Sequence, residues 1–413
     1  MREGSFPMWS SYRAKQRHFV IGIMSGTSLD GVDAALVQID TDTGADSGGT
    51  IKSLSMAAFQ YVPFSKELRD RLIRLCAVDT ARLDELVTAH FGVSEWYAHA
   101  VQLLLQSAGM KPSEVDAISM HGQTIWHAPE RSDFPGPTGP VAVRSTLQIG
   151  ETAVVAERTG IPVIGNLRAR DMAAGGEGAP LAPYLDSLLF GHPGEGRIVQ
   201  NIGGIGNATV IPARSTGEEV YAYDTGPGNM VVDALVREES GGRLQYDEGG
   251  AIAASGEVCE ELVALFYDSD EFYRRVPPKS TGREVYGSGY AARFLAEGRR
   301  RQLRFEDIAA SATALTARSI VQSYEQFVFP ATGIGEVIVS GGGSHNKTML
   351  SMMRSMLPDS TKLSTTAEHG MQDDAREAIA FAVLGHQSLM GKPGNLPAVT
   401  GADKQVILGH LTL

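Results

Sequence analysis

The sequence predicts an α/β protein made of two related halves, and three observations support this. The chain has 413 residues, whereas single cores stop growing at about 250–300 residues, so two domains are expected. Apolar runs at 18–23 and 34–39 flank a cluster of Gly, Ser, Thr and Asp, as in a β-hairpin. The same pattern of strand, small-residue turn and strand recurs at 198–211, and the last third alternates helices with a strand.

The remaining elements follow from hydrophobic periodicity. Apolar residues recur at steps of three and four at 66–76 and from 80 through 108, which predicts helices. The segment 128–145 is rich in Pro and Gly and lacks periodicity, so we expect a surface loop there. Strands are expected at 56–62, 117–121 and 336–340, and further helices at 308–327, 347–356 and 374–385.

Composition excludes several classes of protein. A net charge of -12 argues against nucleic acid as the main partner, because phosphate binding requires a clustered basic surface. Cys76 and Cys259 are far apart and not in a metal-binding spacing. No apolar run approaches the roughly 20 residues that span a bilayer. Residues 1–17 are polar and basic, so we expect a disordered extension rather than a signal peptide, and a cytoplasmic protein.

The first hairpin turn is a candidate phosphate site. Residues 24–33 read MSGTSLDGVD, in which small residues let backbone N–H groups approach phosphate oxygens and hydroxyl groups add donors. Asp30 and Asp33 could hold Mg²⁺, directly or through water. Taken alone, an ordinary turn explains these residues equally well, and the Gly-Lys-Ser/Thr of a Walker motif is absent.

Two later glycine turns have a similar character. Residues 203–207 read GGIGN, and this second turn could cradle phosphates opposite the first. Residues 341–343 are three glycines between a strand and a helix, where an adenosine-contacting loop is the functional interpretation. A plain tight turn is the structural alternative in both places.

Asp224 is the sharpest catalytic candidate. It follows the strand-like residues 220–223 and precedes the glycine-rich entry of a helix near Met230, a position that points a side chain into a cleft. An aspartate is ionised at neutral pH and can accept a proton from water or a sugar hydroxyl. The alternative is that Asp224 caps the helix.

Three further segments carry polar groups. His121, Gln123 and Trp126 combine hydrogen-bonding groups with an aromatic surface, as a sugar site requires. Arg168 and Asp171 precede a glycine loop and could meet an anion, although a solvated charged turn is as good an explanation. The turn 277–284 could be functional or simply a charged surface loop. Glu377 could equally form a surface salt bridge.

Taken together, these segments resemble the anhydro-N-acetylmuramic acid kinase family of 1,6-anhydrosugar kinases. Each is weak alone, but in order they span nearly the whole chain after residue 18. The matching segments are MSGTSLDGVD (24–33), HGQT (121–124), RDMAAGGEGAP (170–180), QNIGGIGNAT (200–209), DTGPGN (224–229), PPKSTGRE (277–284), SGGGSHN (340–346) and DAREAIAFA (374–382).

The resemblance implies a two-domain actin-like ATPase fold, of the acetate and sugar kinase/Hsp70/actin class, with a central cleft between the domains. It implies domain I at 18–196 and domain II at 197–413, and allows the C-terminal segment to pack back on domain I. It also implies ATP and Mg²⁺ as cofactors, a 1,6-anhydro sugar as substrate, and a homodimer.

The resemblance further assigns roles to residues. It implies that Asp224 deprotonates a water that opens the anhydro ring and that Glu377 assists. The groups expected at ATP and Mg²⁺ are Gly26, Thr27, Ser28, Asp30, Gly31, Asp33, Gly203, Gly204, Asn207, Gly341, Gly342 and Gly343. Those expected at the sugar are His121, Gln123, Arg168, Asp171, Gly228 and Asn229.

Departures from the family pattern leave the sugar open. Asn166-Leu167-Arg168 stands where members typically have Asp-Phe-Arg, and Glu177 where they have Gln. Related levoglucosan kinases share the catalytic motifs and the HGQTIW sequence seen here at 121–126. A kinase for levoglucosan or another anhydrohexose is therefore the alternative, and a nucleotide-binding sensor or scaffold without chemistry is the rival from another class.

Overall fold

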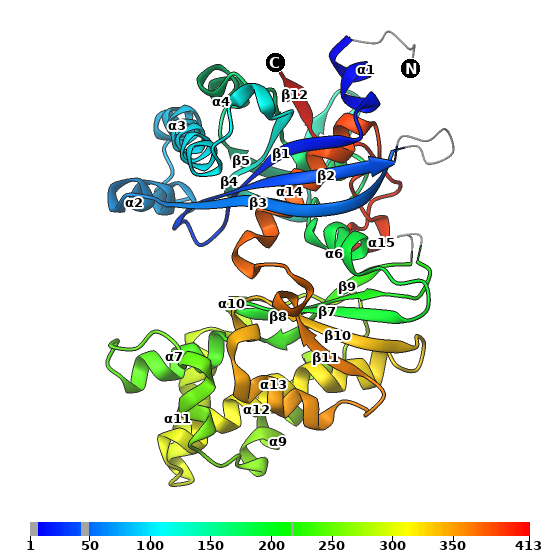
Figure 1. Ribbon diagram of the computed structural model, residues 1–413. Helices are drawn as coiled ribbons and strands as arrows, with labels where there is room; N and C mark the ends of the chain where they lie inside the picture. The colour runs from blue at the N-terminus through cyan, green and yellow to red at the C-terminus, as the bar shows by residue number, and fades with distance from the viewer. Residues whose placement is uncertain (1–6, 43–48, 216–218) are drawn as a thin grey trace. The chain divides into compact units, whose positions relative to one another are not determined.

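The computed structural model describes residues 7–42, 49–215 and 219–413. The chain divides into two compact units (Figure 1). Unit 1 comprises Met1–Leu185 and Asp374–Leu413, and unit 2 is the continuous segment Asp186–Asp373. The expected boundary between the domains is residue 196, with the C-terminal segment allowed to return to the first domain; the structure groups residues 374–413 with unit 1.

Unit 1 is built on one mixed sheet. Along the main path the strand order is β12-β6-β4-β1-β2-β3, and β5 pairs with β4. The first three strands form an antiparallel meander, and β4 and β6 then continue parallel to β1. The strands are β1 (Arg17–Ser25), β2 (Gly31–Asp42), β3 (Thr50–Pro63), β4 (Ala117–Gly136), β5 (Gly139–Ile149), β6 (Val163–Gly165) and β12 (His410–Thr412).

Helices cover both faces of this sheet. Ile21 and Ile23 of β1 pack in one core with Tyr97 and Val101 of α3, whereas Gly22, which faces the other way, contacts α14. The helices are α1 (Pro7–Ala14), α2 (Lys66–Leu75), α3 (Leu83–Ala108), η1 (Pro112–Glu114), α4 (Thr152–Thr159), α5 (Leu167–Ala173), α6 (Ala182–Phe190, which contains the boundary between the units), α14 (Arg376–Met390) and α15 (Pro397–Thr400).

Gly22 allows α14 to approach the sheet closely. A Cβ at this position would lie 1.8 Å from the carbonyl oxygen of Ala378 and 2.7 Å from the backbone nitrogen of Ala382. Only glycine fits such an approach of two backbones. The contact fixes the first turn of α14, and with it Glu377, beside the end of the sheet that carries Asp33.

Part of the expected N-terminal extension is ordered. Residues 1–6 lie outside the described residues, but residues 7–14 form α1, which corrects the expectation of a disordered extension over 1–17. Tyr12 is buried, and its hydroxyl lies 2.7 Å from His386 Nδ1 of α14, while Arg13 Nε donates to the Leu389 carbonyl. Burial of an aromatic ring stabilises a short helix that its propensity alone would not.

The expected surface loop at 128–145 is also corrected. These residues form the outer part of the β4–β5 hairpin, with Phe134 opposite Val141 and Pro135 opposite Pro140 near the tip. Both faces of this part of the hairpin are largely exposed, so the sequence shows no alternation of polar and apolar residues. Three of the prolines, Pro135, Pro137 and Pro140, lie at the tip, where fewer ladder hydrogen bonds are lost, and Pro129 lies in the irregular stretch between Ala128 and Ser132.

Unit 2 repeats the strand order of unit 1. Its sheet runs β11-β10-β7-β8-β9, again an antiparallel meander of three strands followed by two parallel strands on the side of the first. The strands are β7 (Gly196–Ile202), β8 (Ile205–Ile211), β9 (Tyr221–Pro227), β10 (Ile334–Ser340) and β11 (Lys362–Thr365). This shared order confirms the predicted duplication and the predicted fold class, an α/β protein with two actin-like halves.

The helices of unit 2 agree with the periodicity of the sequence. The helix expected at 347–356 is α13, and that at 308–327 lies within α12. The helices are α7 (Met230–Glu239), η2 (Glu248–Gly250), α8 (Ala251–Ala254), α9 (Glu260–Ser269), η3 (Glu271–Arg274), α10 (Arg283–Tyr286), α11 (Ser288–Arg300), α12 (Phe305–Phe327), η4 (Gly342–His345), α13 (Lys347–Met356), η5 (Thr366–His369) and η6 (Asp373–Ala375).

A buried carboxylate ties together the strands of unit 2. Glu336 of β10 is 3% exposed, and its carboxylate lies 2.9 Å from Lys362 Nζ, 3.1 Å from His369 Nε2 and 3.2 Å from Arg197 Nε. Ser364 Oγ donates a further hydrogen bond. Burial acts to raise the pKa of Glu336, but these partners outweigh it and lower the pKa to about 2.

We expect this cluster to make the free energy of unfolding of unit 2 depend on pH in the acidic range. Because the pKa is below its ordinary value of 4.5, the stabilisation is complete above pH 4.5 and is lost as the pH falls towards 2. Glu336→Gln should lower the free energy of unfolding by roughly 1–3 kcal/mol at pH 7 and flatten the acid dependence. Chemical denaturation of wild type, Glu336→Gln and the exposed control Glu325→Gln between pH 2 and 7 checks this. Parallel curves for wild type and Glu336→Gln would contradict it.

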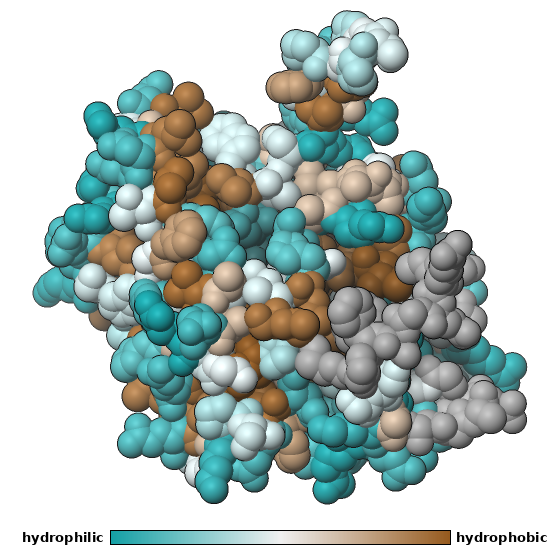
Figure 2. Space-filling model, turned by 90° about the horizontal axis from the view of Figure 1, so that it is seen from above, coloured by the Kyte–Doolittle hydropathy of each residue, from teal (hydrophilic) through white to brown (hydrophobic). Residues whose placement is uncertain are grey.

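In the described part of the chain, no helix is both long and apolar enough to cross a membrane. Figure 2 shows hydrophilic and hydrophobic residues interspersed over the face seen from above.

Candidate functional site

The β1–β2 turn of unit 1 is held from beneath by Gln123. This side chain is fully buried; its Nε2 donates to the Gly26 carbonyl at 2.9 Å, and its Oε1 accepts from Ser25 Oγ. Gln123 was predicted to contact sugar; in this structure its amide bonds to the turn, and the sugar contact stays a prediction. Leu29 in the same turn has φ 55°, a strained conformation for a leucine that typically marks functional sites.

Carboxylates gather at this turn. Asp30 is exposed and accepts from Ser28 Oγ, and Asp33 is half-buried on β2. Burial, followed by the charges of Asp30, Glu377 and Asp374, raises the pKa of Asp33 to about 7. A divalent cation bound here would relieve the repulsion between these carboxylates.

The donor set fits Mg²⁺, which prefers oxygen ligands and keeps several waters. Among the described residues there is no group of three or more His, Cys, Asp or Glu side chains in a metal-binding arrangement. Asp30 and Asp33 would thus supply at most part of the coordination, with water and phosphate oxygens completing it.

Glu377 and Arg168 lie near each other in unit 1. Glu377 lies in the first turn of α14 with part of its surface exposed. Desolvation of its carboxylate by the surrounding protein raises its pKa, and the charges of Arg376 and Arg168 oppose this. The described residues include no ion pair for Glu377, so the surface salt bridge considered for it is absent. Arg168 donates to His121 Nε2 at 2.8 Å and to the Gly178 carbonyl at 2.7 Å, and burial lowers its pKa to about 10.

His121 is a neutral interior group. It is 4% exposed, and burial, followed by the charge of Arg168, lowers its pKa to about 3. Because Nε2 accepts from Arg168, the proton lies on Nδ1, which faces the Ser25 carbonyl at 3.4 Å. His121 therefore links the β1–β2 turn to Arg168, and little of its surface is open to a ligand.

Asp171 is buried and hydrogen-bonds to the backbone and side chains around it. It is fully buried; Oδ2 accepts from the Gly178 backbone nitrogen at 2.8 Å, and Oδ1 accepts from Asn395 Nδ2 and Thr400 Oγ1. Asp171 was predicted to contact sugar; in this structure its oxygens hold the glycine loop, and the sugar contact stays a prediction. Of the two predicted charged sugar ligands, Arg168 alone has part of its surface exposed.

In unit 2 the small-residue turns come together at one end of the sheet. Gly203 and Gly204 follow β7, and the three glycines 341–343 follow β10, the parallel neighbour of β7. A Cβ at Gly341, where φ is 76°, would lie 2.6 Å from Asn201 Oδ1, so this close packing requires glycine. Gly228 and Asn229 join the group through hydrogen bonds to the carbonyls of Gly204 and Gly203.

These turns leave exposed backbone beside each other. Asn229 Nδ2 donates to the Ile202 carbonyl, and Gly204 and Gly342 are exposed. Backbone without side chains at the carboxyl ends of parallel strands can approach phosphate groups closely. The structure thus brings together Gly203, Gly204, Gly228, Asn229, Gly341, Gly342 and Gly343, with Asn207 on the adjoining strand β8.

Asp224 lies on β9, opposite Asn207. Its backbone nitrogen donates to the Lys279 carbonyl at 3.0 Å, and its Oδ2 accepts from Ser280 Oγ at 3.1 Å and from the Thr281 nitrogen at 2.9 Å. Its Oδ1 accepts no hydrogen bond from the described residues. One oxygen is therefore anchored and the other remains free to accept a proton.

The alternative role of Asp224 as a helix cap is wrong. Helix α7 begins at Met230 with Asn229 in the cap position, and no side chain caps it. Burial raises the pKa of Asp224, while Thr281, Ser280 and Lys279 act to lower it. A base whose pKa is moved towards neutrality is better matched to proton transfer.

Sequence reasoning did not assign Lys279, Ser280 or Thr281. The segment 277–284 was considered either a functional turn or a charged surface loop, and its motif PPKSTGRE was the available signal. Ser280 and Thr281 matter because they hydrogen-bond to Asp224 of β9, which lies more than 50 residues away in the chain. No local sequence pattern reveals such a long-range contact.

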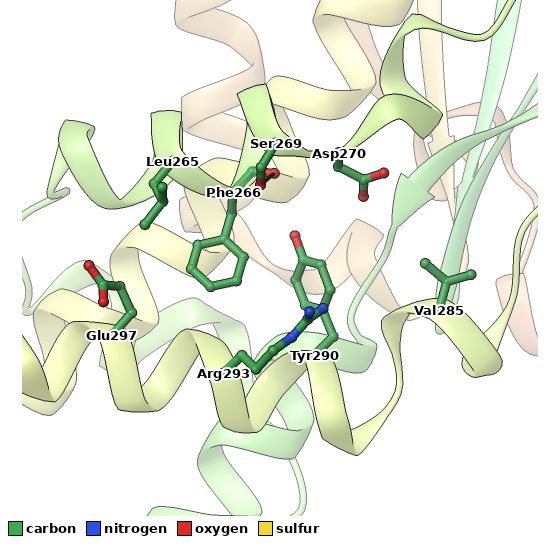
Figure 3. A pocket seen from close by; sticks show the side chains of 8 residues that line it. All are labelled: Leu265, Phe266, Ser269, Asp270, Val285, Tyr290, Arg293 and Glu297. Carbon is green, nitrogen blue, oxygen red and sulfur yellow. Dashed lines mark hydrogen bonds between the residues drawn. The ribbon is translucent and has the colours of Figure 1, made fainter.

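A separate hollow of about 470 Å³ in unit 2 does not contain these groups (Figure 3). Its carboxylates are already satisfied: Asp270 accepts from the Tyr286 hydroxyl and the Phe272 nitrogen, and Glu297 pairs with Arg300 and Arg301. It includes none of the predicted catalytic, nucleotide or sugar residues.

Comparison with known proteins identifies the family of this chain. A family model described as anhydro-N-acetylmuramic acid kinase matches residues 18–413. A protein of that name from Caldanaerobacter subterraneus subsp. tengcongensis is 41% identical over 97% of this chain and 98% of its own, and one from Salinibacter ruber is 42% identical over 97% of each. A solved structure, the ADPNP-bound activator of the 2-hydroxyisocaproyl-CoA dehydratase from Clostridium difficile, is 11% identical over 90% of this chain and 95% of its own, with a TM-score of 0.44. On the strength of the family model and the two relatives, the chain belongs to the anhydro-N-acetylmuramic acid kinase family.

Proposed function

We propose that this protein is an ATP-dependent kinase that opens the 1,6-anhydro ring of anhydro-N-acetylmuramic acid with water and phosphorylates O6, giving N-acetylmuramate 6-phosphate. The observation that carries the proposal is the state of Asp224: a half-buried carboxylate anchored through Oδ2 and free at Oδ1. Family membership supports the kinase activity and the use of ATP.

The first step is hydrolytic. Asp224 Oδ1 accepts a proton from water, the water oxygen bonds to the anomeric carbon, and the bond between that carbon and O6 breaks. The anchoring hydrogen bonds from Ser280 and Thr281 stabilise the ionised carboxylate that this step requires.

The second step is phosphoryl transfer. The released O6 attacks the γ-phosphorus of ATP, and the bond to the β–γ bridging oxygen breaks to leave ADP. Positioning and charge stabilisation supply most of the catalysis in such transfers. In unit 2 the turns at 203–204 and 341–343 offer exposed backbone for the nucleotide, and in unit 1 the 26–33 turn offers Thr27 and Ser28 for phosphates.

Mg²⁺ would be held by Asp30 and Asp33, in part through water, and would neutralise charge on the phosphates when bound. Glu377, placed by its motif, is proposed as the second catalytic carboxylate. Arg168 is the proposed sugar-side cation, because it alone among the predicted charged sugar groups keeps part of its surface exposed. Gly228 and Asn229, which hydrogen-bond to the 203–204 turn, are proposed to contact the sugar.

A kinase for levoglucosan or another anhydrohexose is the alternative. Asn166, where members typically have Asp, stands at the entry of α5 with φ 55°, a conformation that asparagine tolerates. Arg168 follows two residues later, so the departure lies close to the proposed sugar-side cation. A nucleotide-binding sensor or scaffold without chemistry fits less well, since it gives no reason for the anchored carboxylate of Asp224.

We further propose a cytoplasmic protein, where ATP is present, that returns cell-wall sugar to the phosphorylated amino-sugar pool, and a homodimer. The homodimer rests on family resemblance alone, and the mass in solution measured by light scattering tests it.

The experiment that tests the function measures ADP release with Mg-ATP and anhydro-N-acetylmuramic acid, levoglucosan or no sugar. We expect release to depend on sugar and to be fastest with the muramyl sugar, with a product phosphorylated at O6. Preference for levoglucosan would keep the mechanism and change the substrate. Nucleotide binding without sugar-dependent release would favour the sensor.

A further inference from the structure

We infer that Lys279 is a positioning residue for Asp224, holding the segment that anchors its carboxylate. This inference rests on the proposed function. Lys279 is not among the groups proposed to meet the substrate, and it acts through Ser280 and Thr281, the next two residues of the chain.

The ammonium group of Lys279 is fixed inside unit 2. The residue is 8% exposed, and its Nζ donates to the carbonyls of Phe272 at 3.2 Å and Tyr273 at 3.4 Å in η3. The described residues include no carboxylate within ion-pairing distance of it. A buried lysine without such a partner is unusual, because desolvation of the charge is costly.

Aromatic rings replace the missing carboxylate. Nζ lies 4.7 Å from the ring centre of Phe272, 4.9 Å from that of Phe327 in α12 and 5.9 Å from that of Tyr223 in β9. Cation–π attraction in a desolvated site partly offsets the loss of water. Since Tyr223 precedes Asp224 in the chain, the ammonium group ties together η3, α12 and β9 at the residue next to the proposed base.

The backbone of Lys279 completes the arrangement. Its carbonyl accepts from the Asp224 nitrogen, so residues 279–281 run beside Asp224 and present the Ser280 hydroxyl and the Thr281 nitrogen to Oδ2. With the side chain anchored behind and the carbonyl in front, the segment cannot turn away from Asp224. A buried salt bridge could hold the loop equally firmly, but it would place a second carboxylate close to the base.

The charge also acts on the base directly. Lys279 lowers the pKa of Asp224, whereas Glu284 raises it. Burial in turn lowers the pKa of Lys279 to about 8; Asp270 and Asp224 oppose this, and Arg275 adds to it. These are the charged groups that face the ammonium from η3 and its flanks, from β9 and from its own segment, while α12 presents Phe327.

Activity and stability should therefore respond to alkaline pH in opposite directions. Above about pH 8 the ammonium loses its proton and the anchor weakens, so kcat should fall. The unfolded chain, with an ordinary lysine pKa of 10.5, binds more protons in this range, so the contribution of Lys279 to the free energy of unfolding should rise with pH. A residue that is only structural would not lower kcat while the fold becomes more stable.

The test compares wild type, Lys279→Arg and Lys279→Met, with the exposed lysine variant Lys66→Met as control. Each protein is assayed for sugar-dependent kcat from pH 6 to 10, for ATP affinity and for the free energy of unfolding. We expect wild type and Lys66→Met to lose activity above about pH 8, and Lys279→Arg, whose charge persists, to show no decline there, whatever its absolute rate. Lys279→Met should lose roughly 10- to 100-fold in kcat and keep its ATP affinity. The acidic side of its kcat–pH profile should shift to higher pH, because the charge that lowers the pKa of Asp224 is gone.

Coincident profiles for wild type and Lys279→Arg above pH 8, or a native kcat for Lys279→Met, would overturn the inference. If Lys279→Met does not fold, the Lys279→Arg comparison still decides. Failure of the proposed function is recognised separately, because Asp224→Asn would then retain its rate or no sugar would release ADP, and the role of Lys279 would fall with it.

Discussion

Asp224→Asn is expected to lower kcat by roughly 10²- to 10⁴-fold, while ATP affinity and the free energy of unfolding stay near those of wild type. An asparagine side-chain oxygen can still accept from Ser280 Oγ and the Thr281 nitrogen, so the anchoring segment is kept. What is lost is an ionised oxygen able to take a proton from water. Steady-state ADP release, together with calorimetric ATP binding and chemical denaturation, measures the three quantities.

Asp233→Asn provides the matched control. Asp233 is also half-buried in unit 2, and burial raises its pKa to about 6, but it lies on α7 outside the Ser280–Thr281 anchor. We expect this variant to keep kcat close to wild type. If Asp224→Asn keeps a near-normal rate, Asp224 is not the base; if its ATP affinity collapses, the residue belongs to the nucleotide site instead.

Gly22→Ala should be the most destabilising single-methyl change at the contact between β1 and α14. The added Cβ would meet the Ala378 carbonyl oxygen at 1.8 Å and the Ala382 nitrogen at 2.7 Å, and both are backbone atoms that no rotamer change can move. Helix α14 would have to shift as a whole, so we expect a loss at or above the upper end of the roughly 1–3 kcal/mol typical of overpacking. Denaturant unfolding measures it directly.

The same substitution at Gly92 is the control. Gly92 lies in α3, and a Cβ there would meet nothing within 4 Å. Gly92→Ala should raise the free energy of unfolding by about 0.5–1 kcal/mol, because alanine loses less backbone entropy in a helix. Equal effects at the two positions would show that α14 does not pack on β1 as the structure has it.

Much of the fold was predictable because its signals are local. The two hairpins around 24–33 and 203–207 have apolar strands on either side of small residues, and both are present. Helix α13 matches its periodicity at both ends. The hairpin at 128–145 was missed because strands exposed on both faces carry no hydrophobic alternation.

The site was less predictable because the type of a residue does not reveal whether its polar group faces a ligand or the protein interior. Gln123 and Asp171 carry the same chemistry as ligand-binding residues, yet both are fully buried and hold turns in place. Lys279 was missed for the opposite reason: a lysine in a turn suggests an exposed charge, whereas its aromatic surroundings come from η3, α12 and β9. Such surroundings arise only when segments far apart in the chain pack together.

The discontinuity of unit 1 has a consequence for how the protein is made. Unit 2 is a single stretch, so it can fold on the ribosome as soon as residue 373 has emerged. Unit 1 must wait for residues 374–413, since α14 covers one face of β1 and β4, and β12 pairs with β6. Until then that face of the sheet lacks its cover, so we expect the N-terminal half to expose apolar residues such as Val20 during synthesis. The order of maturation thus runs against the order of the sequence.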